Sequence, residues 1–469
     1  WAEAKEARTG RGADLKLESI RYLAISISDV ATEQGVSPIG PASRLLGQSG
    51  ERAWHYEVLK ELAGILKDQA RYDEAIEAYL YLQQRFPLSP DGPQFQNNVI
   101  VLYNNLVPPD PKAAADARVQ LTNLYGLNSP WYEANKNNKD AIALATQYIL
   151  EALESVAYTY HQAALDSGQA ADYMLAAQKY EEYLARYPFA KNAYELSYNL
   201  AECYFWIGGD LVKDEDGQMV SGWERAIAQY SKLFGFPEDE YRKDAILGIM
   251  YSYNFIWKAR EGGYKTNPAA LANLRPPLGE TVEFAALPIS ELSKNYIQSV
   301  RWVQREITDF EEVAVVLYDV GELFYYANYL DHAREVFNNI VQDYPSTDFA
   351  AFAAGRIVDS YLYTGDLTKM RESTERFAAL ELGSDAALAE ERNRTFAGLA
   401  RDSLFKEGEM AYETESYECA LTSFLDYFDL YGDRGTAKDM QNIDLVVYNV
   451  AQAYSKLGRT DESNQYFEL

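Results

Sequence analysis

Histidine and cysteine, two residue types that commonly carry catalysis, are rare in this chain of 469 residues, with three and two copies. Its three histidines are His55, His161 and His332, and none has a second His or a Cys within one helical turn. Metal ligands that share a helix need such a spacing. The sequence also contains no glycine-rich phosphate loop, no HExxH and no GxSxG. We therefore expect no catalytic residue, no metal site and no cofactor, and we predict a protein that is not an enzyme.

One short stretch resembles part of a calcium-binding loop. Asp214, Asp216 and Gly217 match three positions of an EF-hand loop. However, Val212 stands where the first ligand belongs, and Trp223 stands where the closing glutamate belongs. An Asp-Gly pair between short apolar stretches is typical of a β-hairpin turn. We therefore predict a small hairpin insertion over residues 208–222 and keep calcium binding as the weaker hypothesis.

The charge of the chain restricts its partners. It carries 43 Lys and Arg residues against 71 Asp and Glu residues, a formal net charge of −28. Such a chain repels nucleic acid and anionic lipid surfaces and favours basic or neutral partners. We expect acidic pairs such as Glu181-Glu182 to lie on solvated helix faces. The two cysteines, Cys203 and Cys419, have no Cys or His at metal-ligand spacing, and Cys203 is predicted to be a core residue.

A further set of side chains suits the binding of another protein. Aromatic residues recur at one position of several helical patterns, and glutamates recur four residues further on. The predicted set is Tyr198, Glu202, Phe205, Trp206, Tyr318, Glu322, Tyr325, Tyr326, Phe405, Glu409, Tyr412 and Tyr448, with His161 at a position equivalent to Tyr318. Aromatic side chains offer a large contact area, and glutamates beside them suit Lys or Arg. The alternative is that these aromatics pack against neighbouring helices of the same chain.

The elements that must position these side chains are helical hairpins, and the clearest one covers residues 317–345. Apolar residues at spacings of three and four predict its first helix. Gly321 lies in the middle of that helix, where glycine costs roughly 1 kcal/mol relative to alanine. We expect a second helix to pass close by, with small Ala333 allowing the approach and Phe337 filling the space beside it. Pro345 ends the second helix.

Four further stretches repeat this spacing of small, aromatic and terminal residues. The five stretches are 59–87, 160–188, 317–345, 404–427 and 447–467. They resemble the tetratricopeptide (TPR) repeat, a helical hairpin of about 34 residues. The resemblance implies an all-α fold, an α-solenoid built as a right-handed superhelix of TPR-like hairpins, with a concave groove lined by the first helices. It does not extend to the Lys, Asn and Arg clamp of chaperone-binding TPR proteins, because the matching positions here are aromatic and acidic.

The repeats divide the chain into segments. The predicted segments are 1–50 (N-terminal irregular or capping helices), 51–257 (N-terminal TPR-like block with the insertion at 208–222), 258–287 (long loop) and 288–469 (C-terminal TPR-like block). Within the first segment, Gly35, Pro38, Gly40 and Pro41 predict a loop. Loops as long as the one at 258–287 are often functional.

The repeat endings carry a second resemblance. An aromatic residue and a proline, with a small residue two positions later, close three repeats at Phe86-Pro87, Tyr187-Pro188 and Tyr344-Pro345. This ending is similar to that of bacterial envelope TPR proteins, such as the outer-membrane assembly lipoproteins and the Tol-Pal-associated coordinator. It implies a periplasmic or outer-membrane-associated protein, with a cytoplasmic location as the alternative.

These observations lead to one functional hypothesis and two alternatives. The chain is predicted to be a non-catalytic scaffold of a bacterial envelope assembly that grips basic or extended segments of other proteins, envelope proteins in particular, in its aromatic and acidic groove. The alternatives are a structural subunit of a larger multimeric complex, and a carbohydrate- or lipoprotein-handling factor with residues 258–287 as a lid. No apolar run approaches the ~20 residues that span a membrane. The chain starts at Trp1 rather than Met and stops within a helical pattern, so we expect both of its ends to be trimmed.

Overall fold

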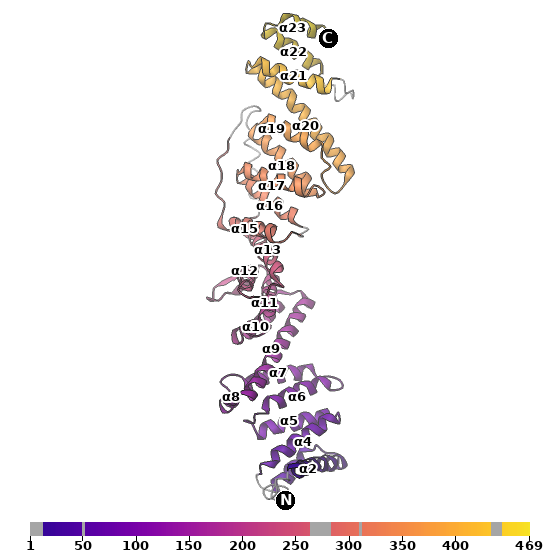
Figure 1. The fold of residues 1–469 in the computed structure, drawn as a ribbon, viewed down its shortest axis with the longest axis vertical. Helices are drawn as coiled ribbons and strands as arrows, with labels where there is room; N and C mark the ends of the chain where they lie inside the picture. The colour runs from indigo at the N-terminus through magenta and orange to yellow at the C-terminus, as the bar shows by residue number, and fades with distance from the viewer. Residues whose placement is uncertain (1–12, 49–51, 263–282, 309–311, 433–442) are drawn as a thin grey trace. The chain divides into compact units, whose positions relative to one another are not determined.

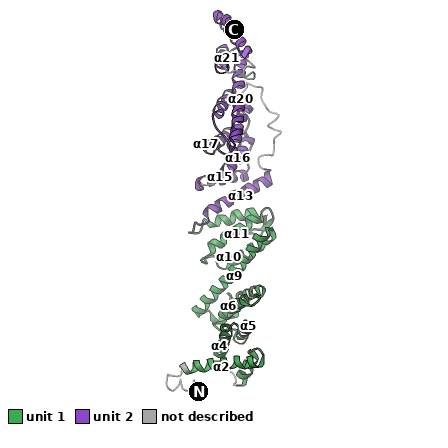
Figure 2. Cartoon of the chain, turned by 90° about the vertical axis from the view of Figure 1, so that its right-hand side faces the viewer, with its two compact units in different colours: residues 1–238 green, residues 239–469 purple. Residues whose placement is uncertain are grey.

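The fold is built almost entirely from helices. The computed structural model describes residues 13–48, 52–262, 283–308, 312–432 and 443–469. Within these ranges the chain forms 21 helices and one two-stranded sheet (Figure 1). The all-α prediction is therefore confirmed. The chain divides into two compact units, residues 1–238 and 239–469 (Figure 2).

In the first unit, each helix packs against its neighbours along the chain. Its helices and strands are α2 (Ala13–Gln34), α3 (Ile39–Gln48), α4 (Trp54–Asp68), α5 (Tyr72–Arg85), α6 (Gly92–Asn105), α7 (Pro111–Tyr125), α8 (Pro130–Asn135), α9 (Lys139–Ser167), α10 (Ala170–Arg186), α11 (Ala193–Ile207), β1 (Leu211–Lys213), β2 (Met219–Ser221) and α12 (Gly222–Leu233). α4 packs on α5, α6 on α7, α9 on α10 and α11 on α12, and each pair contacts the next. This nearest-neighbour packing is that of an α-solenoid.

The second unit repeats the same arrangement. Its helices are α13 (Arg242–Glu261), α15 (Glu291–Glu306), α16 (Val313–Tyr326), α17 (Leu330–Asp343), α18 (Asp348–Thr364), α19 (Leu367–Ala378), α20 (Ala386–Glu413), α21 (Tyr417–Tyr431), α22 (Ile443–Lys456) and α23 (Thr460–Glu468). α13 packs on α15, α16 on α17, α18 on α19, α20 on α21 and α22 on α23. Each unit therefore follows the predicted α-solenoid.

The five predicted hairpins are confirmed as the pairs α4–α5, α9–α10, α16–α17, α20–α21 and α22–α23. The close approach predicted at Gly321 is also present. A Cβ atom on Gly321 would lie 2.8 Å from Cδ1 of Phe337, and a Cβ atom on Gly408 would lie 2.6 Å from Cε1 of Phe424. Real Cβ atoms essentially never come so near another heavy atom. Both glycines therefore make room for a buried phenylalanine of the second helix.

Six hairpin turns share one backbone conformation. In each, the residue two positions before the second helix has a positive φ. These residues are Ala70 (58°), Gly168 (64°), Asn328 (61°), Gly365 (76°), Glu415 (59°) and Gly458 (74°). In five of the turns the following amide donates to a carbonyl five residues back, as Arg71 N does to Leu66 O at 3.0 Å. This is the Schellman motif, in which a left-handed residue lets the chain leave one helix and satisfy its last carbonyls.

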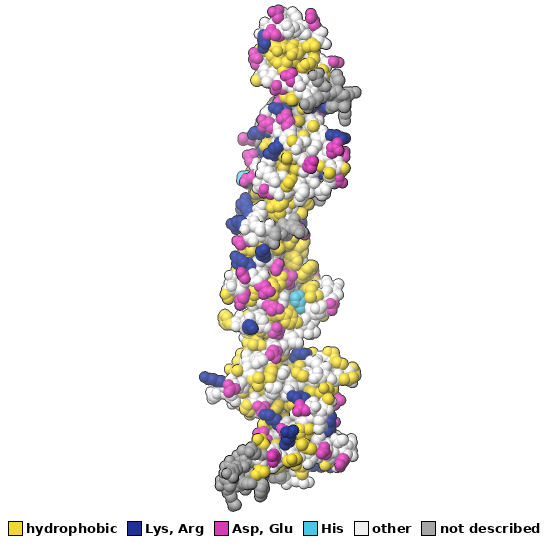
Figure 3. Space-filling model, turned by 45° about the vertical axis from the view of Figure 1, so that its right-hand side comes forward, with side chains coloured by type: hydrophobic (Ala, Val, Ile, Leu, Met, Phe, Trp, Pro, Cys, Tyr) yellow, Lys and Arg dark blue, Asp and Glu magenta, His cyan; other side chains and the backbone are white. Residues whose placement is uncertain are grey.

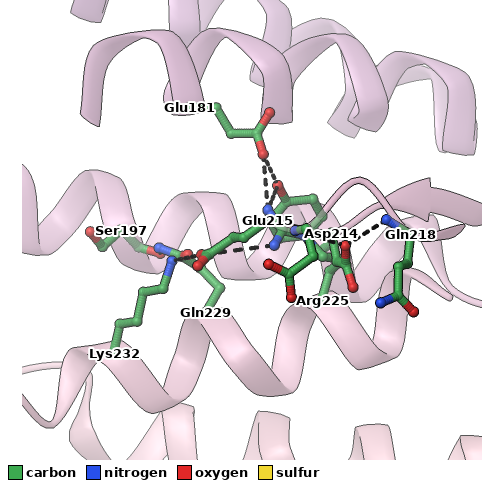
Figure 4. Close-up of polar contacts among 10 residues, drawn as sticks. Glu181, Ser197, Asp214, Glu215, Gln218, Arg225, Gln229 and Lys232 are labelled. Carbon is green, nitrogen blue, oxygen red and sulfur yellow. Dashed lines mark hydrogen bonds and ion pairs between the residues drawn. The ribbon is translucent and has the colours of Figure 1, made fainter. Parts of the chain in front are cut away.

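The predicted insertion is a β-hairpin. β1 and β2 pair antiparallel with Val212 opposite Val220, and Gly217 has a φ of 80°. Oδ1 of Asp214 accepts the backbone amides of Asp216 (3.0 Å) and Gln218 (2.7 Å). This carboxylate therefore holds the turn that joins the two strands (Figure 4).

A buried arginine links the insertion to three helices. The Arg225 guanidinium on α12 donates to Glu181 of α10 at 3.0 Å and to the Tyr204 hydroxyl of α11 at 2.8 Å. Its other terminal nitrogen lies 3.9 Å from Glu215 in the hairpin turn, and Lys232 also pairs with Glu215. Figure 4 shows these side chains converging on Arg225. The insertion is thereby attached to α12, with Arg225 at the centre of the contacts.

The compact units divide after Glu238, and in the second unit α13 packs on α15, where Trp257 stacks on Tyr296 with ring centroids 5.1 Å apart. The segment boundary at 258–287 stays a prediction. One detail differs from the sequence-based expectations. The loop predicted around Gly40 and Pro41 is wrong at these two residues, because α3 already begins at Ile39. Proline is accommodated in a first helical turn, where its missing amide has no helical partner. Residues 1–12, and residues 263–282 of the predicted long loop, lie outside the described residues.

Candidate partner-binding site

A hollow of about 840 Å³ follows one face of α9 in the first unit. Its lining residues are Glu151, Glu154, Ser155, Tyr158, Thr159, Gln162, Ala163 and Asp166. They recur at alternating spacings of one and three, so they share one helix face. Three of the eight are carboxylates and none is Lys or Arg. We call this surface the α9 groove.

The length of α9 explains why this face is long and regular. The helix has 29 residues, and the Asn138 side chain caps its start by accepting the Ala141 amide at 3.2 Å. Gly168 ends it in a left-handed conformation with a φ of 64°. Small residues on the opposite face, such as Ala157 and Ala164, are fully buried. The helix therefore packs through small side chains and directs its longer ones into the groove.

A fourth carboxylate, Glu195 in the first turn of α11, lies beside the α9 groove. The Tyr158 hydroxyl donates to Glu195 at 2.7 Å, and the Asn192 amide donates to Glu154 at 2.5 Å. Burial raises the pKa of Glu154, and the negative charges of Glu195 and Glu151 raise it further, against the opposing Asn192 hydrogen bond. The chain thus brings negative charges together here without a cation among the lining residues. A cation supplied by another molecule would relieve this repulsion.

His161 does not take the groove position predicted for it. Nδ1 of His161 lies 2.9 Å from the Tyr180 hydroxyl, and its ring also meets the Tyr173 ring edge-on at 6.3 Å. Both tyrosines belong to α10, so the histidine lies between the helices of its own hairpin. Burial there lowers its pKa. Its role is packing and hydrogen bonding within the hairpin.

Of the twelve predicted binding residues, four lie on α11, and their side chains differ in how exposed they are. Glu202 is half-buried and accepts a hydrogen bond from Tyr230 of α12. Tyr198 is half-buried beside the same tyrosine, with ring centroids 6.3 Å apart. Phe205 meets Trp206 edge-on at 5.6 Å, and Trp206 also stacks on Tyr173 at 6.4 Å. Trp206 remains 56% exposed, so it is the member of this group that presents most surface to a partner.

Glu322 on α16 is buried and paired with another residue of the same chain. Only 1% of its surface is exposed, and both of its oxygens accept from Arg356 of α18, at 2.5 and 2.9 Å. The same guanidinium lies over the rings of Tyr325 (5.3 Å) and Tyr326 (5.8 Å). Tyr325 is itself buried. The prediction that Glu322 and Tyr325 present their side chains to a partner is therefore corrected, because α18 packs over this face of α16.

The remaining predicted residues of the second unit are spread over separate hairpins. Tyr318 is half-buried and packs against Phe337 and Phe349, each at 5.5 Å between ring centroids. Phe405 is buried against the rings of α21, and this corrects its expected exposure in the same way. Glu409 pairs with Lys406 at 2.7 Å, and Tyr412 meets Tyr417 edge-on. Tyr448 is 51% exposed.

The α9 groove was not among the sequence-based predictions. Its acidic and tyrosine residues at helical spacing are visible in the sequence between Glu151 and Asp166. The sequence pattern placed His161 in the groove, whereas the structure turns His161 inward with Ala157 and Ala164 and leaves Tyr160 and Ala163 exposed. The error in register moved the expected binding face onto the wrong side of α9.

Two properties of the described residues bear on other functions. No group of three or more His, Cys, Asp or Glu side chains in the described part of the chain is placed to hold a metal ion. Across the same residues, no helix combines the length and the apolar character needed for a membrane span.

Comparison with known proteins gives weak likenesses only. No protein-family model matches the chain, and no curated protein matches it. Among solved structures, it is similar to the TPR domain of P58(IPK), with 11% identity, a TM-score of 0.23, and coverage of 86% of this chain and 99% of that chain. It is also similar to a human IFIT1 dimer with m7Gppp-AAAA, with 12% identity, a TM-score of 0.20, and coverage of 91% of this chain and 92% of that chain. A third similar structure is the APC/C hetero-tetramer Cut9-Hcn1, with 14% identity, a TM-score of 0.17, and coverage of 95% of this chain and 85% of that chain. At such values these likenesses support no inference about partners, and the helical hairpins described above define the fold.

Proposed function

We propose that this chain is a non-catalytic scaffold that binds extended, basic segments of other proteins in the α9 groove. The observation that supports this most directly is a hollow lined by three carboxylates and by no Lys or Arg, with Glu195 beside it on Tyr158. Lysine and arginine side chains of an extended segment match both the charge and the length of such a groove. Tyr158 adds an aromatic surface beside the carboxylates.

The elongated form of the groove supports a peptide rather than a small molecule. Drug-sized ligands occupy pockets of about 300–1,000 Å³ that enclose most of their surface. The α9 groove reaches about 840 Å³, but its lining residues come from a single helix and extend over four turns from Glu151 to Asp166. A linear segment that follows the helix contacts all of these turns at once.

The proposal is tested with a fluorescein-labelled peptide of alternating Lys and Ala residues, by fluorescence anisotropy with the whole chain. We expect binding that weakens as salt rises, because charge pairs at an open surface are screened. The triple variant Glu151→Gln, Glu154→Gln, Glu195→Gln is expected to bind at least about tenfold more weakly, since several charge contacts are lost together.

A matched control removes the same charge elsewhere in the first unit. Glu57→Gln, Asp68→Asn and Asp73→Asn alter exposed acids of α4 and α5. This triple variant is expected to bind the peptide as the unaltered chain does. Equal weakening by both triple variants would show attraction to the net charge of −28 rather than to the groove, and would overturn the proposal.

Self-assembly is a second candidate, favoured by an exposed aromatic pair on the last hairpin. Tyr448 of α22 and Phe467 of α23 are 51% and 50% exposed, and their ring centroids lie 5.9 Å apart. Figure 3 shows hydrophobic side chains gathered near the C-terminal end of the second unit. Light scattering over a range of concentrations tests this candidate. A dimer that Phe467→Glu dissociates would support it, and a monomer at every concentration would exclude it.

We also propose a bacterial envelope setting, as a periplasmic or outer-membrane-associated protein. It is supported by the aromatic-proline repeat endings alone, at Phe86-Pro87, Tyr187-Pro188 and Tyr344-Pro345. Fractionation of source cells, followed by detection of the chain with an antibody, tests it. Recovery only with the cytoplasmic fraction would rule this setting out.

A further inference from the structure

A short segment of the second unit lies against the first helices of two hairpins. Residues 283–290 carry no helix or strand and lead into α15. The Leu287 amide donates to the carbonyl of Ala327 at 2.9 Å, and the side-chain amide of Asn328 donates to the carbonyl of Ala285 at 3.0 Å. Ala327 and Asn328 form the turn after α16. Figure 1 draws this segment running from the start of α15 past α16 and α17 toward α18.

The segment is anchored by one aromatic side chain. The ring of Phe284 stacks on the ring of Tyr363 in α18, with centroids 4.1 Å apart and planes 13° from parallel. Tyr325 of α16 lies beside Tyr363 at 6.5 Å. The contact combines a stacked ring at Phe284 with hydrogen bonds to the backbone one and three residues later, at Ala285 and Leu287, as in the binding of an extended peptide.

The segment is held by few interactions. Within residues 283–290, Phe284 and Ile289 are half-buried and the others are exposed, with Leu287 at 51%. Segments with so little burial open at low free-energy cost. The contact as it stands also leaves two buried polar atoms unsatisfied, the Tyr363 hydroxyl and Oδ1 of Asn328, which have no hydrogen-bond partner among the described residues. Buried polar atoms normally find partners.

We propose that residues 283–287 are an internal ligand of a second peptide site, formed by Tyr325, Asn328 and Tyr363, and that an extended partner segment binds there by displacing them. This site lies in the second unit and does not depend on the α9 groove. The partner class follows from the observed contacts. It has an aromatic residue at position i, a free carbonyl at i+1 and a free amide at i+3, so proline is excluded at i+3. A polar side chain that reaches the Tyr363 hydroxyl would bind more tightly than the internal segment.

The test uses the segment itself as the probe, supplied in trans. A fluorescein-labelled peptide, Glu-Phe-Ala-Ala-Leu-Pro-Ile, is titrated with the whole chain and with Phe284→Ala. An internal ligand reduces apparent affinity by the fraction of sites left free. If the segment occupies its site about nine-tenths of the time, Phe284→Ala is expected to bind the peptide about tenfold more tightly than the unaltered chain.

Two further measurements locate the site. Adding Asn328→Gly to Phe284→Ala keeps the left-handed backbone at that position, which glycine adopts freely, and removes one hydrogen bond. We expect about fivefold weaker peptide binding from this loss. A peptide with Pro in place of Leu lacks the donated amide and is expected to bind more weakly than one with Ala there.

Three outcomes would overturn the proposal. They are equal peptide binding by the unaltered chain and Phe284→Ala, binding that Asn328→Gly leaves unchanged, and equal binding of the Pro and Ala peptides. Melting curves of each variant test whether the helices remain folded. The glutamine variants of the α9 groove test whether this peptide binds there instead. They are expected to leave its binding unchanged.

Discussion

Glu322 and Arg356 form a two-pronged ion pair between consecutive hairpins of the second unit, with hydrogen bonds of 2.5 and 2.9 Å. Glu322 is 1% exposed, and Arg356 also covers the rings of Tyr325 and Tyr326. Fork-shaped arginine–carboxylate pairs are geometrically specific. This pair therefore fixes how α18 lies on α16, and it is a structural contact rather than part of a binding surface.

Removing one partner of this ion pair is expected to lower the free energy of unfolding strongly. Arg356→Met leaves a buried carboxylate without a cation, and we expect a loss of about 3–5 kcal/mol in the free energy of unfolding. The double variant Glu322→Met, Arg356→Met removes both charges and is expected to recover most of that loss. Urea unfolding followed by circular dichroism measures both. A double variant as unstable as the single one would mean that packing of the arginine, not its charge, is what matters.

The pH dependence of that variant has a definite sign. Burial raises the pKa of Glu322 above its ordinary value of 4.5, although Arg356 opposes the shift. The folded chain therefore keeps a proton that the unfolded chain has released, and this contribution to stability is lost as pH rises through the raised pKa. Without Arg356 the fall in unfolding free energy with rising pH is expected to be steeper than in the unaltered chain. Unfolding midpoints between pH 4 and pH 8 test this, and parallel curves would contradict it.

The close approach at Gly321 predicts opposite effects for two glycine substitutions. Glycine to alanine in a helix ordinarily stabilises by roughly 0.5–1 kcal/mol. At Gly321 the new Cβ meets the ring of Phe337, so Gly321→Ala is expected to destabilise by about 1–3 kcal/mol. Gly355 of α18 has nothing within 4 Å of its Cβ position, so Gly355→Ala should stabilise. Thermal melting of both variants tests these two effects. A higher melting temperature for Gly321→Ala would refute the steric clash with Phe337.

From the shared backbone conformation of the hairpin turns, we predict that glycine can replace two of the non-glycine residues with positive φ. Ala70 and Glu415 hold positive φ values of 58° and 59°, a conformation that costs an L-residue roughly 1–2 kcal/mol. Because both side chains are exposed, Ala70→Gly and Glu415→Gly are expected to stabilise by about 0.5 kcal/mol after the added chain entropy is counted. Gly458→Ala, in the equivalent turn, should destabilise by a similar amount. Melting temperatures that move the other way would show that the turns are not equivalent.

Glu154 is expected to favour binding at the expense of stability. Burial and neighbouring carboxylates raise its pKa, so at neutral pH its charge opposes folding. Glu154→Gln should therefore raise the free energy of unfolding slightly, by ~0.5 kcal/mol at this partly exposed site. The same change should weaken binding of the Lys-Ala peptide. In the unaltered chain, affinity for that peptide should increase as pH rises through the pKa of Glu154, and a flat profile would argue against its contact with the peptide.

The elements that the sequence predicted well are those governed by local spacing. Gly321, Ala333 and Phe337 belong to two adjacent helices, so their meeting follows from helical periodicity. The hairpin at 208–222 follows from one Asp-Gly turn. The partner-binding residues were harder to predict from the sequence, because the exposure of Glu322 depends on Arg356, which belongs to the next hairpin. Sequence spacing does not state how one hairpin lies on another, and a shift of register on α9 placed the binding face on the wrong side.

The nearest-neighbour packing within each unit has a mechanical consequence. In the second unit, helices make their main contacts with neighbours one or two places along the chain. A pulling force on that unit therefore meets no long-range clamp like that of a β-sandwich, and the hairpins can detach in sequence. We therefore expect this unit to stretch in small steps and to recover them when the force is released.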